Sequence, residues 1–86
     1  MTAVSGNLTD AANSASYTPT KDTTEVMVTR NAAAGAVFLE AYDPTATKWV
    51  VVGKEGTYGV TTPDYAIVYR FRSTGVGADF DYYIGP

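Results

Sequence analysis

Apolar side chains recur at every second position along several short stretches of the chain. The clearest stretches are residues 24–30, 36–43, 66–73 and 79–84. An extended strand points successive side chains to opposite faces, so this period of two predicts β-strands that each bury one face. The helical period is not sustained over two turns in any segment. The chain is therefore expected to be all-β.

Shorter stretches complete an expected set of about seven short strands. Residues 15–19, 49–52 and 57–61 are rich in β-branched or aromatic residues and are bounded by turns containing Gly, Pro or Asp. The stretches 36–43 and 49–52 are separated by one short turn, which predicts a hairpin. Strands that repeat every ~8–12 residues with Gly and Pro turns predict a small antiparallel β-sandwich or barrel.

The apolar face of each predicted strand defines an expected core. Its members are Val26, Val28, Val37, Leu39, Trp49, Val51, Ile67, Tyr69, Phe71, Phe80, Tyr82 and Ile84. The same alternation places Phe38, Tyr42 and Tyr83 on the opposite faces of their strands. Aromatic side chains grouped on an exposed face indicate an interface, and the alternative is the ordinary, partly covered face of a sandwich.

Residues 1–14 show neither period and are predicted to form an extended N-terminal arm. The remaining residues, 15–86, then form a single β-sandwich domain, because the chain length suffices for one domain only. Val4 and Leu8 are the apolar side chains expected to anchor the arm on a neighbouring molecule. A chain end stays mobile unless contacts hold it in place.

The composition limits how a chain of 86 residues is stabilised. A domain of this size has a thin core and an expected stability of roughly 3–5 kcal/mol. The chain contains no Cys and no His, so it forms no disulfide and lacks the usual zinc ligands. Association with a partner surface is therefore the expected source of additional stability.

Charge and hydropathy argue against two classes of partner. The formal net charge is −3, and the six basic residues are spread along the chain. Nucleic-acid binding requires clustered Lys and Arg that neutralise phosphates, so no nucleic-acid partner is expected. No apolar run approaches the ~20 residues that span a membrane, so no membrane partner is expected either.

Catalysis is not expected, because His is the commonest general base near neutral pH and the chain has none. Two carboxylate pairs, Glu40 with Asp43 and Asp79 with Asp81, remain formal alternatives of the glycosidase type. Carboxylates at such spacings usually lie on a solvated face. A calcium site at Asp79 and Asp81 would need more oxygen ligands than these two residues offer. We therefore expect no catalytic, cofactor or metal site.

Two further features leave alternatives open. Trp49 begins a strand after a turn and is expected to fill the core, whereas an exposed Trp49 would form a stacking platform for a sugar ring. Arg70 and Arg72 lie off the core face of their strand. Their expected partners are Asp79 and Asp81 across a final hairpin, and the alternative is an ion pair with another subunit.

Two segments resemble a pattern found in small bacteriophage virion proteins. They are VFLEAYDPTATKWVVV at 37–52 and YRFRSTGVGADFDYYI at 69–84, and SASYTP at 14–19 resembles the opening of the same proteins. The matching residues are Val37, Leu39, Glu40, Asp43, Trp49, Tyr69, Arg70, Phe71, Arg72, Gly75 and Tyr83. The spacer 44–47 departs from the Gly-rich turn that many such sequences have at this point.

The resemblance implies a capsid decoration (cement) protein, a head fibre or another exterior part of the virion. Such a protein would bind the major capsid protein on the outer surface of the capsid and stabilise the shell. Copies are expected to form a homo-oligomer, with a trimer as the first expectation. The alternatives are a carbohydrate-binding or receptor-binding module and a tail or neck connector. The residues expected at the interface are Val4, Leu8, Phe38, Tyr42, Arg70, Arg72 and Tyr83.

Overall fold

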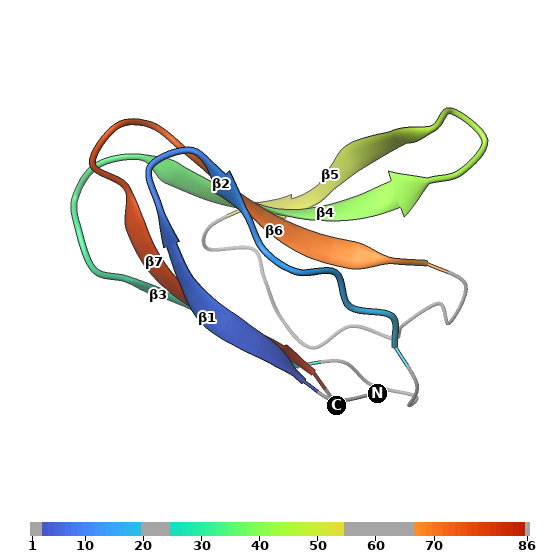
Figure 1. The fold of residues 1–86 in the computed structure, drawn as a ribbon, viewed down its shortest axis with the longest axis horizontal. Helices are drawn as coiled ribbons and strands as arrows, with labels where there is room; N and C mark the ends of the chain where they lie inside the picture. The colour runs from blue at the N-terminus through green and yellow to red at the C-terminus, as the bar shows by residue number, and fades with distance from the viewer. Residues whose placement is uncertain (1–2, 20–24, 55–66, 86) are drawn as a thin grey trace.

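The computed structural model describes residues 3–19, 25–54 and 67–85. Its strands are β1 (Val4–Thr9), β2 (Ala12–Asn13), β3 (Glu25–Arg30), β4 (Ala36–Asp43), β5 (Lys48–Lys54), β6 (Tyr69–Thr74) and β7 (Asp79–Gly85). They form two antiparallel sheets, one of three strands in the order β1-β7-β3 and one of four strands in the order β2-β6-β4-β5. The sheets are the two layers of a β-sandwich, which confirms the predicted fold class (Figure 1).

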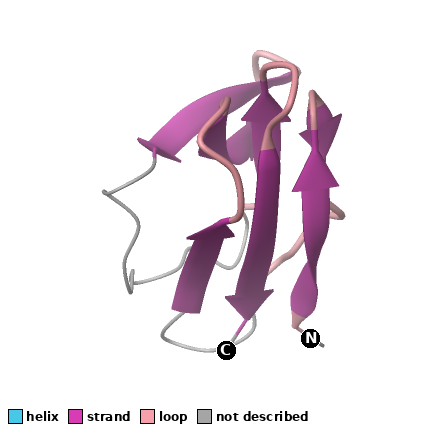
Figure 2. Cartoon of the chain, turned by 90° about the vertical axis from the view of Figure 1, so that its left-hand side faces the viewer, coloured by secondary structure: helices cyan, strands magenta, loops and turns pink. Residues whose placement is uncertain are grey.

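The alternating sequence of β7 explains the three-stranded sheet. This strand lies in the middle, with β1 on one side and β3 on the other (Figure 2). Its buried residues Phe80 and Ile84 are paired with Leu8 and Val4 of β1, and Ile84 is also paired with Val26 of β3. Residues directly opposite each other point to the same face, so these apolar side chains cover the inner face together.

The strands with the clearest alternation occur where the pattern predicts them. The stretches 24–30, 36–43, 66–73 and 79–84 correspond to β3, β4, β6 and β7, although β6 begins only at Tyr69, and β4 and β5 form the predicted hairpin. Residues 15–19 contribute only an isolated bridge between Tyr17 and Tyr69. The predicted strand at 57–61 lies outside the described residues.

The prediction of an extended arm at residues 1–14 is wrong over its described part. Residues Val4–Thr9 pair with β7 along their whole length, and Ala12–Asn13 pair with β6 in the other sheet. Leu8 is 3% exposed in the core, and Val4 packs partly buried against it. Both side chains therefore belong to the interior of this chain and do not anchor an arm on a neighbour.

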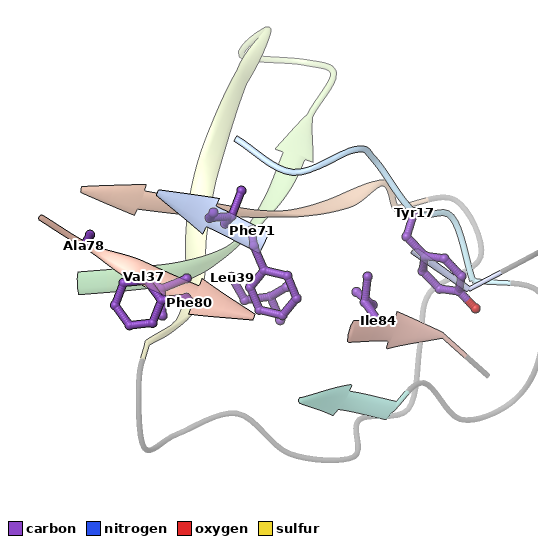
Figure 3. Close-up of a cluster of buried hydrophobic side chains, with 8 residues drawn as sticks. Tyr17, Val37, Leu39, Phe71, Ala78, Phe80 and Ile84 are labelled. Carbon is purple, nitrogen blue, oxygen red and sulfur yellow. The ribbon is translucent and has the colours of Figure 1, made fainter. Parts of the chain in front are cut away.

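The core lies between the two sheets (Figure 3). The prediction is confirmed for five buried residues: Val37, Leu39, Phe71, Phe80 and Ile84. Four other predicted members are partly buried against this cluster: Val26, Val28, Tyr69 and Tyr82. Leu8, Tyr17 and Ala78 are core residues that the pattern did not indicate.

The predicted core face is wrong for two residues of β5. Trp49 pairs with Tyr42, and Val51 pairs with Glu40, so both share the face opposite to buried Leu39. Val51 is 46% exposed. Ile67, the remaining predicted core member, is half-buried beside Leu39 at a hollow on the inner side.

The predicted final hairpin does not form. Strands β6 and β7 follow each other in the chain but belong to different sheets. The turn 75–78 therefore crosses from one layer to the other, as the left side of Figure 1 shows. Arg70 and Arg72 consequently lie on a different sheet from Asp79 and Asp81, and the predicted ion pairs between them are wrong.

Candidate interaction site

The outer face of the four-stranded sheet carries a cluster of aromatic and charged side chains. The register pairs Phe38 with Arg72 and Glu40 with Arg70 between β4 and β6. Because Val37 and Leu39 fill the core from the intervening positions, these four side chains point away from it. We call this surface the cationic face, and its residues are Phe38, Glu40, Tyr42, Trp49, Lys54, Arg70 and Arg72.

Glu40 is the centre of the cationic face. Its carboxylate accepts a hydrogen bond from Arg70 Nε at 3.0 Å on Oε1 and from Arg72 Nε at 2.9 Å on Oε2. The Glu40 side chain is 5% exposed, whereas that of Arg70 is 19% and that of Arg72 is 33% exposed. A buried carboxylate needs such partners, because removing an unpaired charge from water is strongly unfavourable.

Each arginine also stacks on an aromatic ring. The Arg70 guanidinium carbon lies 4.1 Å from the centre of the Trp49 ring, and that of Arg72 lies 5.1 Å from the centre of the Phe38 ring. Both distances fall in the range of cation–π attraction. The contacts on this face form one continuous row, in which the side chains follow in the order Trp49, Arg70, Glu40, Arg72 and Phe38. Every guanidinium in this row is held by a carboxylate on one side and by a ring on the other.

The β4–β5 turn places Trp49 on this face. Asp43 Oδ1 accepts hydrogen bonds from the backbone N–H groups of Thr45 and Ala46, at 2.9 and 3.1 Å. This turn aligns Tyr42 with Trp49, whose rings meet edge to face with centres 5.3 Å apart. Tyr42, Phe38 and Trp49 are all half-buried. Trp49 is therefore not the core residue that the sequence predicts.

The arrangement has the properties of a binding surface for a carboxylate-bearing partner. A guanidinium presents a planar fork of donors that matches a carboxylate, and stacking on rings fixes the orientation of that fork. Because the arginines are already ordered, less conformational entropy is lost when a partner binds. Two guanidinium groups share one carboxylate, so the row keeps a net positive charge.

The opposite outer face, on the three-stranded sheet, is acidic. It carries Glu25, Met27, Asp79, Asp81 and Tyr83, and we call it the acidic face. The amide of Asn7 donates to Asp79 Oδ1 at 2.7 Å and to Asp81 Oδ1 at 2.9 Å. Hydrogen bonds from the amides of Asn7 and then of Asn31 lower the pKa of Asp79 below its ordinary value.

The carboxylates of the two pairs noted in the sequence are each engaged by neighbouring groups. Glu40 is occupied by the two arginines, and Asp43 accepts the hydrogen bonds of its turn. Asp79 and Asp81 are joined through Asn7 on a sheet face. Across the described residues, no group of three or more His, Cys, Asp or Glu side chains is placed to hold a metal ion.

The structure divides the predicted interface residues into three groups. Phe38, Tyr42, Arg70 and Arg72 come together on the cationic face. Tyr83 lies on the acidic face, and Val4 and Leu8 belong to the core region. Glu40 and Trp49 belong to the cationic face but were not predicted for the interface. The sequence feature that could have indicated Glu40 as an interface residue is its position between Phe38 and Tyr42 on the same face of β4.

Comparisons with protein-family models, with curated proteins and with solved structures find no match to this chain. The described part of the chain contains no helix long and apolar enough to cross a membrane. The fold and the site thus define an all-β, two-sheet protein with an arginine–aromatic row on one outer face.

Proposed function

We propose that this protein is a non-enzymatic structural protein that binds a macromolecular partner through its cationic face. The observation that carries the proposal is the row of Arg70 and Arg72, fixed by buried Glu40 and stacked on Trp49 and Phe38. The absence of His and Cys from the sequence supports a role without catalysis.

In its specific form, the proposal is a capsid decoration (cement) protein of a bacteriophage. The partner is then the major capsid protein, and the location is the outer surface of the capsid. The resemblance of residues 37–52 and 69–84 to small virion proteins supports this form. A rigid sandwich that contacts two capsid subunits adds buried surface across their junction and so holds the shell together.

Electron microscopy of virions purified from the source of the gene tests this proposal. Immunogold labelling with antibodies against the purified chain should cover the whole shell. Label at a single vertex would instead indicate a neck or tail connector, and particles without label would overturn the virion assignment.

A binding experiment tests the role of the cationic face. Shells stripped of the protein are mixed with the wild type, with Arg72→Gln and with Val76→Ser, and bound protein is measured by co-sedimentation. Val76 is 93% exposed in the turn after β6, away from both sheet faces, and so provides the matched control. Arg72→Gln should weaken binding at least about tenfold, since loss of one partner of a buried, hydrogen-bonded charge pair at an interface costs about 2 kcal/mol or more. Equal binding by all three proteins would contradict the assignment of the face.

A second candidate function is carbohydrate or receptor binding, which the position of Trp49 beside Tyr42 on an outer face favours. Arg70 covers part of the Trp49 ring, which leaves less of it for a sugar. A glycan array separates the two functions. Saturable glycan binding that Trp49→Ala abolishes would favour this candidate, whereas an array without binding favours the structural role.

A further inference from the structure

The two outer faces of the sandwich carry charges of opposite sign. The acidic face has the carboxylates of Glu25, Asp79 and Asp81, and its described residues include no Lys or Arg. The cationic face has Arg70 and Arg72 on either side of Glu40, with Lys54 opposite Phe38, and Glu40 is its one carboxylate among the described residues. The two faces belong to different sheets, so they point in opposite directions.

We propose that copies of this chain associate head to tail, with the cationic face of one copy on the acidic face of the next. The inference rests on the proposed function only in taking the cationic face as a binding surface. Within the stack, the partner of the cationic face is a second copy of the chain. In an open stack of copies, the cationic face of the first copy contacts no other copy and remains available to bind the capsid surface.

Charge complementarity selects this arrangement over a symmetric dimer. Pairing two cationic faces would bring Arg72 and Lys54 against the same residues of a second copy, and like charges at an interface are strongly unfavourable. Pairing two acidic faces would likewise bring the carboxylates of one copy against those of the other. Only the pairing of unlike faces matches opposite charges, and such an interface produces a ring or an open stack.

The acidic face has a hollow whose lining suits a cationic side chain. A shallow hollow of about 190 Å³ is lined by Met27, Thr29, Asp81, Tyr82 and Tyr83. It therefore combines a carboxylate with an aromatic ring and an apolar side chain, and Met27 is 56% exposed there. The partner face supplies the matching group, because Arg72 is its more exposed guanidinium.

Sedimentation velocity on the purified chain tests the inference. Wild-type protein should form dimers and larger species between about 10 µM and 1 mM, and these should dissociate in about 1 M NaCl, where charges are screened within ~3 Å. A single monomeric species over the whole concentration range would overturn the inference, even if the protein binds virions. Conversely, assembly in solution without any binding to virions would contradict only the proposed function.

Charge-reversal variants distinguish head-to-tail from symmetric pairing. Arg72→Glu blocks the cationic face and Asp81→Lys blocks the acidic face, so each variant alone should be monomeric. Their equimolar mixture should associate again, because the intact cationic face of Asp81→Lys meets the intact acidic face of Arg72→Glu. Self-association of Asp81→Lys alone would show that cationic faces pair with each other and would overturn the inference.

A second pair of variants guards against loss of folding. Arg72 contacts Glu40, and Asp81 accepts a hydrogen bond from Asn7. Lys54→Glu and Glu25→Lys alter exposed residues on the same two faces. They should give the same result, with monomers when each is alone and restored association when they are mixed. Larger assemblies from either one alone, with folding verified by circular dichroism, would also overturn the inference.

Discussion

Replacing Glu40 with Gln removes the negative charge that holds two guanidinium groups together on the cationic face. Glu40 is 4% exposed, and its two oxygens accept hydrogen bonds of 3.0 and 2.9 Å from Arg70 and Arg72. Gln has nearly the same shape, so the change leaves no cavity. The effect on stability therefore measures the charge and its hydrogen bonds.

The expected loss follows from the burial of the three groups. A hydrogen bond to a charged group contributes about 1.5–3 kcal/mol, and removing one partner of a buried ion pair costs about 3–5 kcal/mol. Because the Arg72 side chain is 33% exposed, solvent screens one half of the network. We expect Glu40→Gln to lower the free energy of unfolding by about 3 kcal/mol. In a domain of this length, such a loss lowers Tm by roughly 15 °C.

Urea unfolding followed by the fluorescence of Trp49, the single tryptophan, measures this loss. Glu25→Gln is the matched control, because Glu25 is an exposed carboxylate on the other sheet. It should change the unfolding free energy by no more than about 0.5 kcal/mol. A change of this small size for Glu40→Gln as well would refute the argument that Glu40 is a buried, charge-bound centre.

Three further changes probe the rest of the structure. Leu8→Ala should reduce the free energy of unfolding by about 2–5 kcal/mol in denaturant titrations, because Leu8 is in the core, whereas a near-neutral effect would restore the arm hypothesis. The folded-state pKa of Asp79 is lowered, so its ionised carboxylate stabilises the fold above the ordinary pKa of about 4, and this stabilisation disappears as the pH falls through the folded value. Asn7→Ala should therefore raise the Asp79 pKa in an NMR titration and make the protein less resistant to acid, and an unchanged pKa would contradict the role of the amide. Tyr17→Phe should be neutral or stabilising by up to about 1 kcal/mol, because the Tyr17 hydroxyl is buried, which also raises its pKa, and it has no hydrogen-bond partner among the described residues. A clear loss of stability would show that the hydroxyl has a partner.

Strand β1 was not predicted, because one glycine interrupts the alternation of apolar side chains that indicates a strand. Val4, Gly6 and Leu8 are the inward positions of this strand, and Gly6 interrupts the apolar alternation. The structure gives the reason, because a Cβ at Gly6 would lie 3.0 Å from the hydroxyl oxygen of Tyr82 on the paired strand. The tyrosine fills the space that an apolar side chain at position 6 would occupy. Without knowledge of this pairing, the segment resembles an arm.

The reversed face of β5 was predictable in principle. The β4–β5 hairpin was expected, and Tyr42 was correctly placed off the core face. The turn 44–47 pairs Asp43 with Lys48, so the next pair outward along the ladder is Tyr42 with Trp49. Paired residues share a face, and Trp49 must therefore follow Tyr42 out of the core. The large apolar surface of Trp49 favoured burial in the sequence interpretation, but the hairpin register decides its position.

The partner of the two arginines could not be read from local sequence. Adjacent strands in the chain usually pair, which made Asp79 and Asp81 the natural candidates for Arg70 and Arg72. In the structure β6 pairs with β4, and the ionic partner is Glu40, thirty residues before Arg70 in the chain. This neighbourhood depends on the order of strands in the sheet, a long-range property that alternation alone does not determine.

A cryo-electron microscopy reconstruction of virions that carry the protein tests the central claim most directly. The account predicts density over the capsid shell in which β4 and β6 turn their outer side, with Arg72 and Trp49, toward the capsid protein. Density in which that side faces solvent while another surface makes the contact would contradict it.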